Sequence, residues 1–270
     1  MLPALLLIVG VWASFIEVLS PPVAAWIAAL AAAAAAVGWC TRAPQETVAS
    51  LALGFWAAGL ALGGDARDRA LHTELRALLE RHAGGFAIET LGPGGIHDPV
   101  PTRVVLAEDA AIRDDFVSLR GDAVAAYAGG AWHEVAGGVS LNVGGAVSPP
   151  AALEWRAGRT IEAPITFRRP ARYLNDGVPD HEQALALDGT TLFGSIKSSL
   201  LIDVAGDGTW IEERAADVRA RVRESVVAWV APHGAVSAAI VAAILIGDRT
   251  GLPEEVRERL QAAGTYHVIA

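Results

Sequence analysis

The first third of the chain carries three long apolar stretches. They run from Leu2 to Leu19, from Pro22 to Cys40 and from Thr47 to Gly63, and the second and third contain no charged residue. Each has about the length that a helix needs to cross a hydrocarbon core of ~30 Å. A buried helical bundle in a soluble protein is the alternative, but successive apolar runs joined by short loops favour the membrane. The pattern therefore predicts three transmembrane helices in residues 1–64.

The loops between these stretches predict an orientation. Arg42 is the only basic residue in them, and positively charged loop residues are retained on the cytoplasmic side. We therefore expect Arg42 in the cytoplasm and the chain beyond Gly64 outside it.

Residues 65–83 show a helical pattern of a different kind. Leu71, Leu75, Leu78 and Leu79 recur at helical spacing, with arginines and glutamates between them. An apolar stripe with charged flanks is typical of an amphipathic helix. We expect a connector helix that lies on the membrane or packs under the next domain.

From residue 84 to residue 209, short apolar runs alternate with clusters of glycine and proline. Such runs with turn residues between them predict the strands of a small barrel or sandwich. The candidate strands are Phe86–Leu91, Thr102–Leu106, Phe116–Ala126, His133–Val143, Arg159–Phe167 and Thr190–Val204. A five-stranded barrel of the OB type fits this count, and other small β folds stay open.

Helical periodicity returns in residues 210–270. Trp210–Val230 carries a stripe of valines with arginines on other faces, which suits a helix at the headgroup layer or one packed on the β domain. The apolar run Val236–Ile246 is too short to span a bilayer comfortably. The whole pattern predicts an α+β membrane protein: N-terminal transmembrane helices, an OB-like β-barrel domain, and further amphipathic or membrane helices.

Composition narrows the chemistry. The net charge is −9 and Lys197 is the only lysine, so nucleic acid can be bound only through a local cluster of arginines. Cys40 is the only cysteine, which excludes an intramolecular disulfide and a cysteine-based metal site. The histidines lack metal-ligand spacing, and we find no nucleotide-binding loop, zinc-protease or nucleophile-elbow motif. We expect no metal, no cofactor and no enzymatic activity, and interpret Ser195 and Lys197 as an exposed strand pair.

Three stretches carry a more specific signal. The first is Trp155–Arg159, and the second runs from Arg168 through Asp180 to Gly189. The third is Ile246–Leu252, followed by an amphipathic helix and the segment Ala263–Ala270. Together with the apolar leader and the β region in this order, they resemble the N-terminal region of the ComEC family of bacterial competence proteins. The resemblance covers essentially the whole chain.

The resemblance implies a function and a location. ComEC-family proteins pass single-stranded transforming DNA through an inner-membrane channel, so we expect a multi-pass inner-membrane protein whose β domain lies outside the cytoplasm and guides DNA. The family's main channel helices, and the nuclease domain of many members, would lie beyond this chain. The implied partners are single-stranded DNA, the bilayer and other competence proteins, and a homo-oligomer is left open.

Two alternatives stand beside this function. In one, the β domain caps or scaffolds the channel without touching DNA. In the other, the chain is a membrane-anchored module that binds peptidoglycan or a protein outside the cytoplasm.

The densest basic cluster lies in the β region, next to aromatic residues. Arginine binds phosphates and aromatic rings stack on bases, which is how OB folds hold single strands. We therefore predict DNA contacts from Arg156, Arg159, Arg168, Arg169, Arg172 and Tyr173. The alternative is that these arginines pair with the domain's carboxylates or with lipid headgroups.

A second candidate site follows from the third family stretch. The resemblance places Gly247, Asp248 and Arg249 at the start of the channel. A turn at the end of a helix accounts for the same residues with fewer assumptions.

Overall fold

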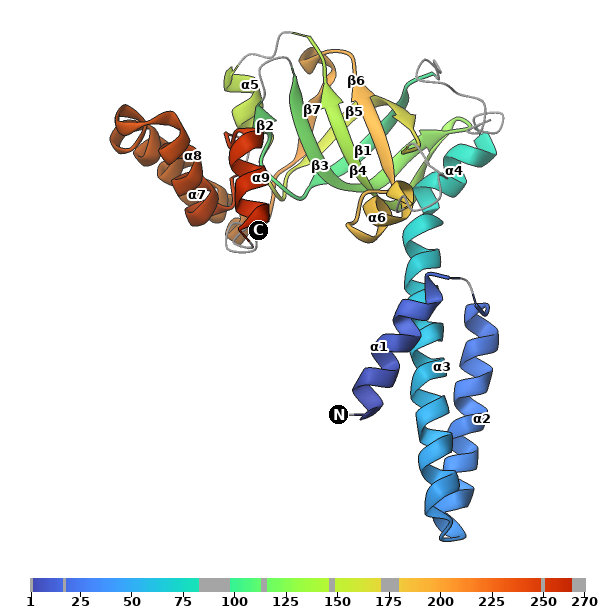
Figure 1. The fold of residues 1–270 in the computed structure, drawn as a ribbon. Coiled ribbons are helices and arrows are strands. Elements are labelled where there is room, and N and C mark those ends of the chain that lie inside the picture. The colour runs from blue at the N-terminus through green and yellow to red at the C-terminus, as the bar shows by residue number, and fades with distance from the viewer. Residues whose placement is uncertain are drawn as a thin grey trace. The chain divides into compact units, whose positions relative to one another are not determined.

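The structure, a computed structural model, divides the chain into two units (Figure 1). One comprises Met1–Thr73 and Ala171–Gly189, and the other comprises Glu74–Pro170 and Thr190–Ala270. The structure describes residues 2–16, 18–82, 98–112, 116–145, 149–170, 180–248 and 251–263. Within them the fold is α+β, with helices and one mixed seven-stranded sheet.

Two helices of the first unit have the length and apolar composition of a membrane span. These are α2 (Pro21–Cys40) and α3 (Pro44–Leu71). The first helix, α1 (Leu2–Ser14), has 13 residues, which at 1.5 Å per residue is about 20 Å. That is short of a core of ~30 Å. Of the three predicted spans, two therefore have the required length and α1 does not.

The helices of the first unit pack closely. Helix α3 contacts α1, α2 and the short α6 (His181–Leu187). A Cβ atom added to Gly59 of α3 would meet the carbonyl oxygen of Leu7, and one added to Gly10 of α1 would meet that of Trp56. Small residues at a crossing let two helix backbones touch, and close backbone packing of this kind drives helix association in lipid.

The predicted connector helix is divided between the two units. Helix α3 continues to Leu71 past the apolar stretch, with an ion pair of 2.7 Å between Arg69 and Asp65 one turn apart. A second helix, α4 (Glu74–His82), begins after Thr73. Its Leu75, Leu78 and Leu79 are buried in the core of the β domain. The leucine stripe is thus split, and its α4 part packs under the β domain.

The strands mostly match the predicted ones. They are β1 (Val100–Leu106), β2 (Ala111–Ile112), β3 (Val117–Ala128), β4 (Ala131–Val143), β5 (Thr160–Arg168), β6 (Leu192–Ile196) and β7 (Asp203–Gly206). The predicted strand Phe86–Leu91 lies outside the described residues. The prediction of one strand over Thr190–Val204 is wrong, because a 3-10 turn at Ser199–Leu201 separates β6 from β7.

Five strands are hydrogen-bonded in a closed cycle. Strand β1 pairs with β3, β3 with β4, β4 with β6, β6 with β5, and β5 with β1 again. Only β4 and β6 run parallel within this cycle; the other pairs are antiparallel. The short β2 and β7 add to β3 and β5 from outside the cycle.

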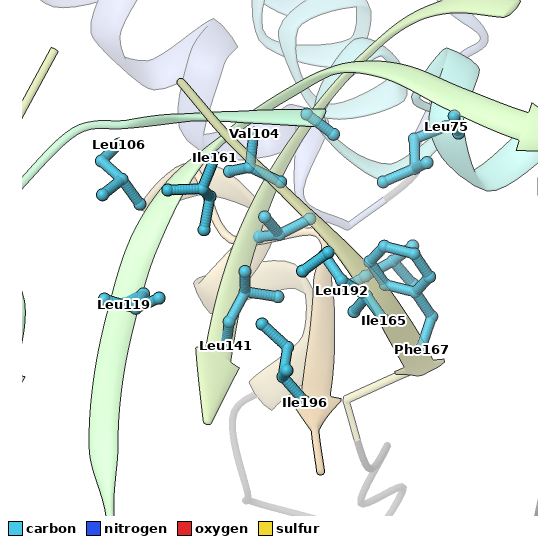
Figure 2. Packing of buried hydrophobic residues seen from close by; sticks show 14 of the residues in the cluster. Leu75, Val104, Leu106, Leu119, Leu141, Ile161, Ile165, Phe167, Leu192 and Ile196 are labelled. Atoms are coloured by element: carbon cyan, nitrogen blue, oxygen red, sulfur yellow. The ribbon is translucent and has the colours of Figure 1, made fainter. Parts of the chain in front are cut away.

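The core of this unit lies inside the ring of strands. Alternate residues of β5 point inward, namely Ile161, Ala163, Ile165 and Phe167, and all are buried. Figure 2 shows Ile161, Ile165 and Phe167 among apolar side chains of the neighbouring strands, such as Val104, Leu141 and Leu192. Burial on one face and exposure on the other follow from the period-two geometry of a strand.

Four helices complete the second unit beside α4. They are α5 (Pro149–Glu154), α7 (Trp210–Trp229), α8 (Ala235–Ile246) and α9 (Glu254–Ala262). Helices α7 and α8 lie side by side as an antiparallel hairpin, joined by a 3-10 turn at Ala231–His233 (Figure 1). Ala239 and Ala243 of α8 pack with Leu252, which precedes α9.

Candidate functional site

The turn before β5 carries the first two arginines of the predicted DNA-binding cluster. This turn, Trp155–Arg159, is held against the end of β1, because the backbone N–H of Gly158 donates to the carbonyl of Leu106 at 2.7 Å. Gly158 has φ +88°, and a Cβ atom there would come within 2.7 Å of the Glu212 carboxyl group. The turn therefore needs glycine to bring its arginines close to the first turn of α7.

Arg159 is engaged by carboxylates on both sides. It donates to the two oxygens of Glu213 at 2.7 and 3.0 Å, and its third nitrogen donates to Glu154 at 2.8 Å. Its side chain is 14% exposed. The hydrogen bond to Glu213 raises the pKa of Arg159 further above its ordinary value, and the same bond lowers the pKa of Glu213.

Arg156 also faces α7. Its guanidinium donates to Asp217 at 3.1 Å and lies 4.0 Å from Glu213. Since Glu213 and Asp217 are four residues apart, they lie on one face of α7. Two residues of the predicted cluster thus contact acidic side chains of the same protein, as the alternative interpretation expects.

The rest of the predicted cluster lies elsewhere. Arg168 ends β5 and is exposed, with its guanidinium carbon 5.2 Å from the ring centre of Phe193 on β6. Arg169 follows it and is partly buried. Arg172 and Tyr173 lie outside the described residues. Of the four described members, Arg156 and Arg159 precede β5, whereas Arg168 and Arg169 lie at its other end. Contact of the cluster with DNA stays a prediction.

Asp109, in the loop after β1, is the centre of the contacts between the β domain and α7. It accepts two hydrogen bonds from Arg219, at 2.9 and 2.7 Å, and one from Arg223 at 2.9 Å. The backbone N–H of Ala157 donates to it at 3.1 Å. Burial alone would raise the pKa of Asp109, but the hydrogen bonds from both arginines outweigh it and hold the pKa well below its usual range.

The same contacts continue to Asp248. Arg223 donates to Asp248 at 2.7 Å, so one guanidinium joins Asp109 to the second residue after the end of α8. Gly247 caps α8, with φ +70° and its N–H bonded to the carbonyl of Ala243. Arg249 lies outside the described residues. For Gly247 and Asp248, the structure describes a helix end fixed by an ion pair.

We refer to this set of charged residues as the ionic network. Its β-domain members come from the loop after β1 and the turn before β5, and its helical members come from α7 and the end of α8. The members are Asp109, Arg156, Arg159, Glu213, Asp217, Arg219, Arg223 and Asp248. Partly buried, bidentate pairs of this kind position helices more firmly than exposed ones. The network therefore fixes α7, and through it α8, to the β domain.

Sequence reasoning missed the centre of this network. Asp109 stands in a short polar loop, and no motif in the sequence marks it as a contact residue. For the arginines of α7, the sequence predicted only that they lie on other faces of the helix than the valine stripe. The available signal was spacing: Arg219 and Arg223 are four residues apart, as are Glu213 and Asp217, so α7 presents paired charges of each sign.

A second exposed group lies at the tip of the β3–β4 hairpin. Tyr127 and Trp132 sit opposite each other across the Gly129-Gly130 turn, with ring centres 5.7 Å apart in an edge-to-face arrangement. They are 40% and 38% exposed. The guanidinium of Arg103 on β1 lies 4.4 Å from the ring centre of Trp132, within the range of a cation–π contact. We call these three residues the aromatic patch.

The aromatic patch was not predicted either. A two-residue Gly-Gly turn is a hairpin signal, and the two aromatic residues two positions outside it were the available clue. Arg103 also pairs with Glu162 at 2.8 Å, so its charge is partly balanced. Chemically, the patch offers two ring faces or edges and one guanidinium to a planar ligand.

Metal chemistry has no visible basis in the described part of the chain, where no group of three or more His, Cys, Asp or Glu side chains could hold an ion. Comparison with models of protein families, with curated proteins and with solved structures found no match to this chain.

Proposed function

We propose that the chain is the N-terminal, membrane-anchored part of a ComEC-like protein that takes up single-stranded DNA across the bacterial inner membrane. In this proposal the β domain is an OB-like barrel outside the cytoplasm, and it guides the strand at the outer mouth of the channel. The resemblance of the three sequence stretches is the starting point, and the following observations support it.

The cycle of strand pairings supports an OB-like barrel. Five strands that return to the first one, with Greek-key order, are the hallmark of that architecture. In chain order, the five strands of the cycle are β1, β3, β4, β5 and β6. The fourth of them, β5, pairs with the first, and the fifth, β6, lies parallel to the third, β4. The order is therefore not a simple meander.

The aromatic patch is the observation that carries the DNA proposal. In OB folds the face of the second and third strands binds oligonucleotides. Counted within the cycle, β3 and β4 hold these positions, and they bear Tyr127 and Trp132 with Arg103 beside them. Bases stack on aromatic side chains, each contributing about 1–3 kcal/mol, without regard to sequence. A guide that passes any strand needs contacts of this kind.

The two helices that are long and apolar enough to cross a membrane support the proposed location. With Arg42 in the cytoplasm between α2 and α3, a single crossing by α3 leads to the β domain. The domain then lies outside the cytoplasm whether or not α1 crosses.

The ionic network favours a second candidate, a scaffold without DNA contact. Arg156 and Arg159 direct their donors to α7, so two of the predicted phosphate ligands serve to hold a helix. A β domain that positions α7 and α8 at the channel would need the network but not the aromatic patch.

A binding titration separates the two. The full chain in detergent is titrated with fluorescently labelled single-stranded and duplex DNA over a range of salt concentrations. Preference for the single strand at low salt, lost on replacing Trp132, is the expected result. An affinity that is undetectable at the lowest salt would leave the scaffold as the function.

A further inference from the structure

The tip of the α7–α8 hairpin is free of formal charge on both arms. From Ser225 to Gly247 the sequence contains no Asp, Glu, Lys or Arg. The charges of α7 lie before this run, and Arg219 and Arg223 bind Asp109 and Asp248 at the base of the hairpin. The hairpin therefore has a charged base fixed to the β domain and an apolar tip that extends from it (Figure 1).

Large apolar side chains at this tip face outward. Val227 is 67% exposed and Trp229 is 78% exposed, and Val236 in the first turn of α8 is 44% exposed. An open groove of about 530 Å³ between the two helices is lined mainly by apolar side chains, among them Val226, Val230 and Val241. An apolar surface of this extent marks an interaction site.

The dimensions of the tip match a bilayer surface and not a crossing. Glu224, the last charged residue of α7, is six residues from Val230 at the turn, which is about 9 Å along the helix axis. Interfacial helices bury their apolar face ~5–10 Å into the boundary between headgroups and acyl chains. Helix α8, with 12 residues, is about 18 Å long and falls short of a hydrocarbon core of ~30 Å.

The polar groups of the hairpin agree with shallow insertion. Arg221 is exposed at the polar end of the groove, one turn and a half below Val226, where a lipid phosphate would lie when the tip is buried. His233 at the turn is exposed, and an imidazole is tolerated at the interface more easily than in the hydrocarbon centre. Trp229 brings an indole to the depth that indoles favour.

We propose that the α7–α8 hairpin inserts its tip, through Val227, Trp229 and Val236, into one leaflet of an anionic phospholipid bilayer. The presence of a membrane rests on the proposed function, in which α2 and α3 anchor the chain in a bilayer. This contact would anchor the β domain to the surface at a second point. It does not depend on DNA binding, and it would hold equally for the scaffold function.

The test measures the depth of single labelled positions in the full chain. Cys40, the only cysteine, is replaced by serine, and single cysteines are introduced as Val227→Cys, Val236→Cys and, as controls, Val124→Cys on β3 and Ile211→Cys at the start of α7. Each variant is labelled with an environment-sensitive fluorophore and placed, one copy per disc, in nanodiscs of phosphatidylglycerol and phosphatidylcholine. Lipids carrying a nitroxide near the headgroup or near the end of the acyl chain serve as quenchers.

Labels at positions 227 and 236 are expected to lose most of their fluorescence to the shallow quencher and less to the deep one. The two controls keep theirs, and Val227→Glu restores the fluorescence of the label at position 236. Absence of lipid quenching at both tip positions overturns the proposal. Protection of the labels from aqueous iodide without lipid quenching also overturns it, because protein would then cover the tip. Stronger quenching by the deep probe than by the shallow one overturns it as well, because the hairpin would then cross the bilayer.

Discussion

Arg159 and Glu213 are joined by two parallel hydrogen bonds, of 2.7 and 3.0 Å, that tie the start of β5 to the first turn of α7. A guanidinium in this geometry is specific for its carboxylate. One of the predicted phosphate ligands is therefore a structural link between a strand and a helix.

Arg159→Ala should destabilise the β domain by about 2 kcal/mol. The change removes charge-assisted hydrogen bonds of ~1.5–3 kcal/mol each and leaves Glu213 without its partner. Arg168→Ala, on the exposed end of β5, should stay within about 0.5 kcal/mol of the parent. Denaturant titration of the full chain in detergent, with hydrogen exchange of the α7 amides, measures both. Equal stability of the two variants would contradict the role given to Arg159.

Asp109 should make the stability of the second unit fall in acid. Its folded-state pKa lies well below the ordinary value of 3.8, so its contribution is complete above that value and is lost as the pH falls through the window below it. Asp109→Asn removes the titrating group. The free energy of unfolding of the parent should exceed that of the variant at neutral pH, and the difference should shrink below about pH 4. A difference that is constant with pH would mean that Asp109 acts by shape and not by charge.

Trp132→Ala should weaken single-stranded DNA binding roughly 5- to 150-fold, the equivalent of one lost stacking contact of ~1–3 kcal/mol. Trp210→Ala is the matched control, because Trp210 is exposed on α7 away from the patch. Fluorescence anisotropy with a short labelled strand measures the affinities. If both tryptophan variants lose affinity equally, the patch is not the binding surface.

The salt dependence of binding should be shallow. For single strands, the slope of log K against log salt is about −0.7 per phosphate contact. Arg103 and Arg168 would supply about two contacts and a slope of about −1.4. Participation of Arg156 and Arg159 would roughly double the slope. Arg156→Ala should therefore leave the slope unchanged, and a clear reduction would restore the originally predicted cluster.

Gly59→Ala should loosen the crossing of α1 and α3, because the added methyl group meets the backbone of Leu7. Gly54→Ala is the control on the same helix. A Cβ atom there lies 3.5 Å from that of Ala31, an ordinary contact, and alanine favours the helix. Thermal unfolding in detergent should show a lower midpoint for the first variant only. Identical midpoints would mean that α1 is not held by this contact.

The periodic features of the sequence predicted most of the fold. Inward residues such as Ile161 and Ile165 alternate strictly, so β5 was found within one residue. The apolar run at α8 was matched as closely. The prediction failed where the apolar pattern does not follow the backbone conformation. Helix α3 continues beyond Gly63 through polar residues, although the apolar stretch ends there. Leu200 and Leu201 are apolar but form a 3-10 turn instead of part of a strand.

The sites were harder to predict than the elements. Arg156 and Arg159 look the same in a sequence whether they face phosphate or carboxylate, because their partners Glu213 and Asp217 are more than 50 positions away. Asp109 is separated from Arg219 by 110 positions. Only the three-dimensional fold decides which of the many charges meet, and single-sequence patterns carry no record of it.

The pairing that closes the ring sets an order for folding during synthesis. Strand β3 can pair with β1 and with β4 as soon as the β3–β4 hairpin has left the ribosome. The other edge of β1 can pair only after β5 has been made. The other edge of β4 can pair only after β6, the last of the five strands, has been made. Until Ile196 has emerged, β1 and β4 are open edges that invite wrong partners. Helix α4, made just before β1, buries its leucines against β3 and β4. It can therefore shield the apolar face of the unfinished sheet while the last strands are still being synthesised.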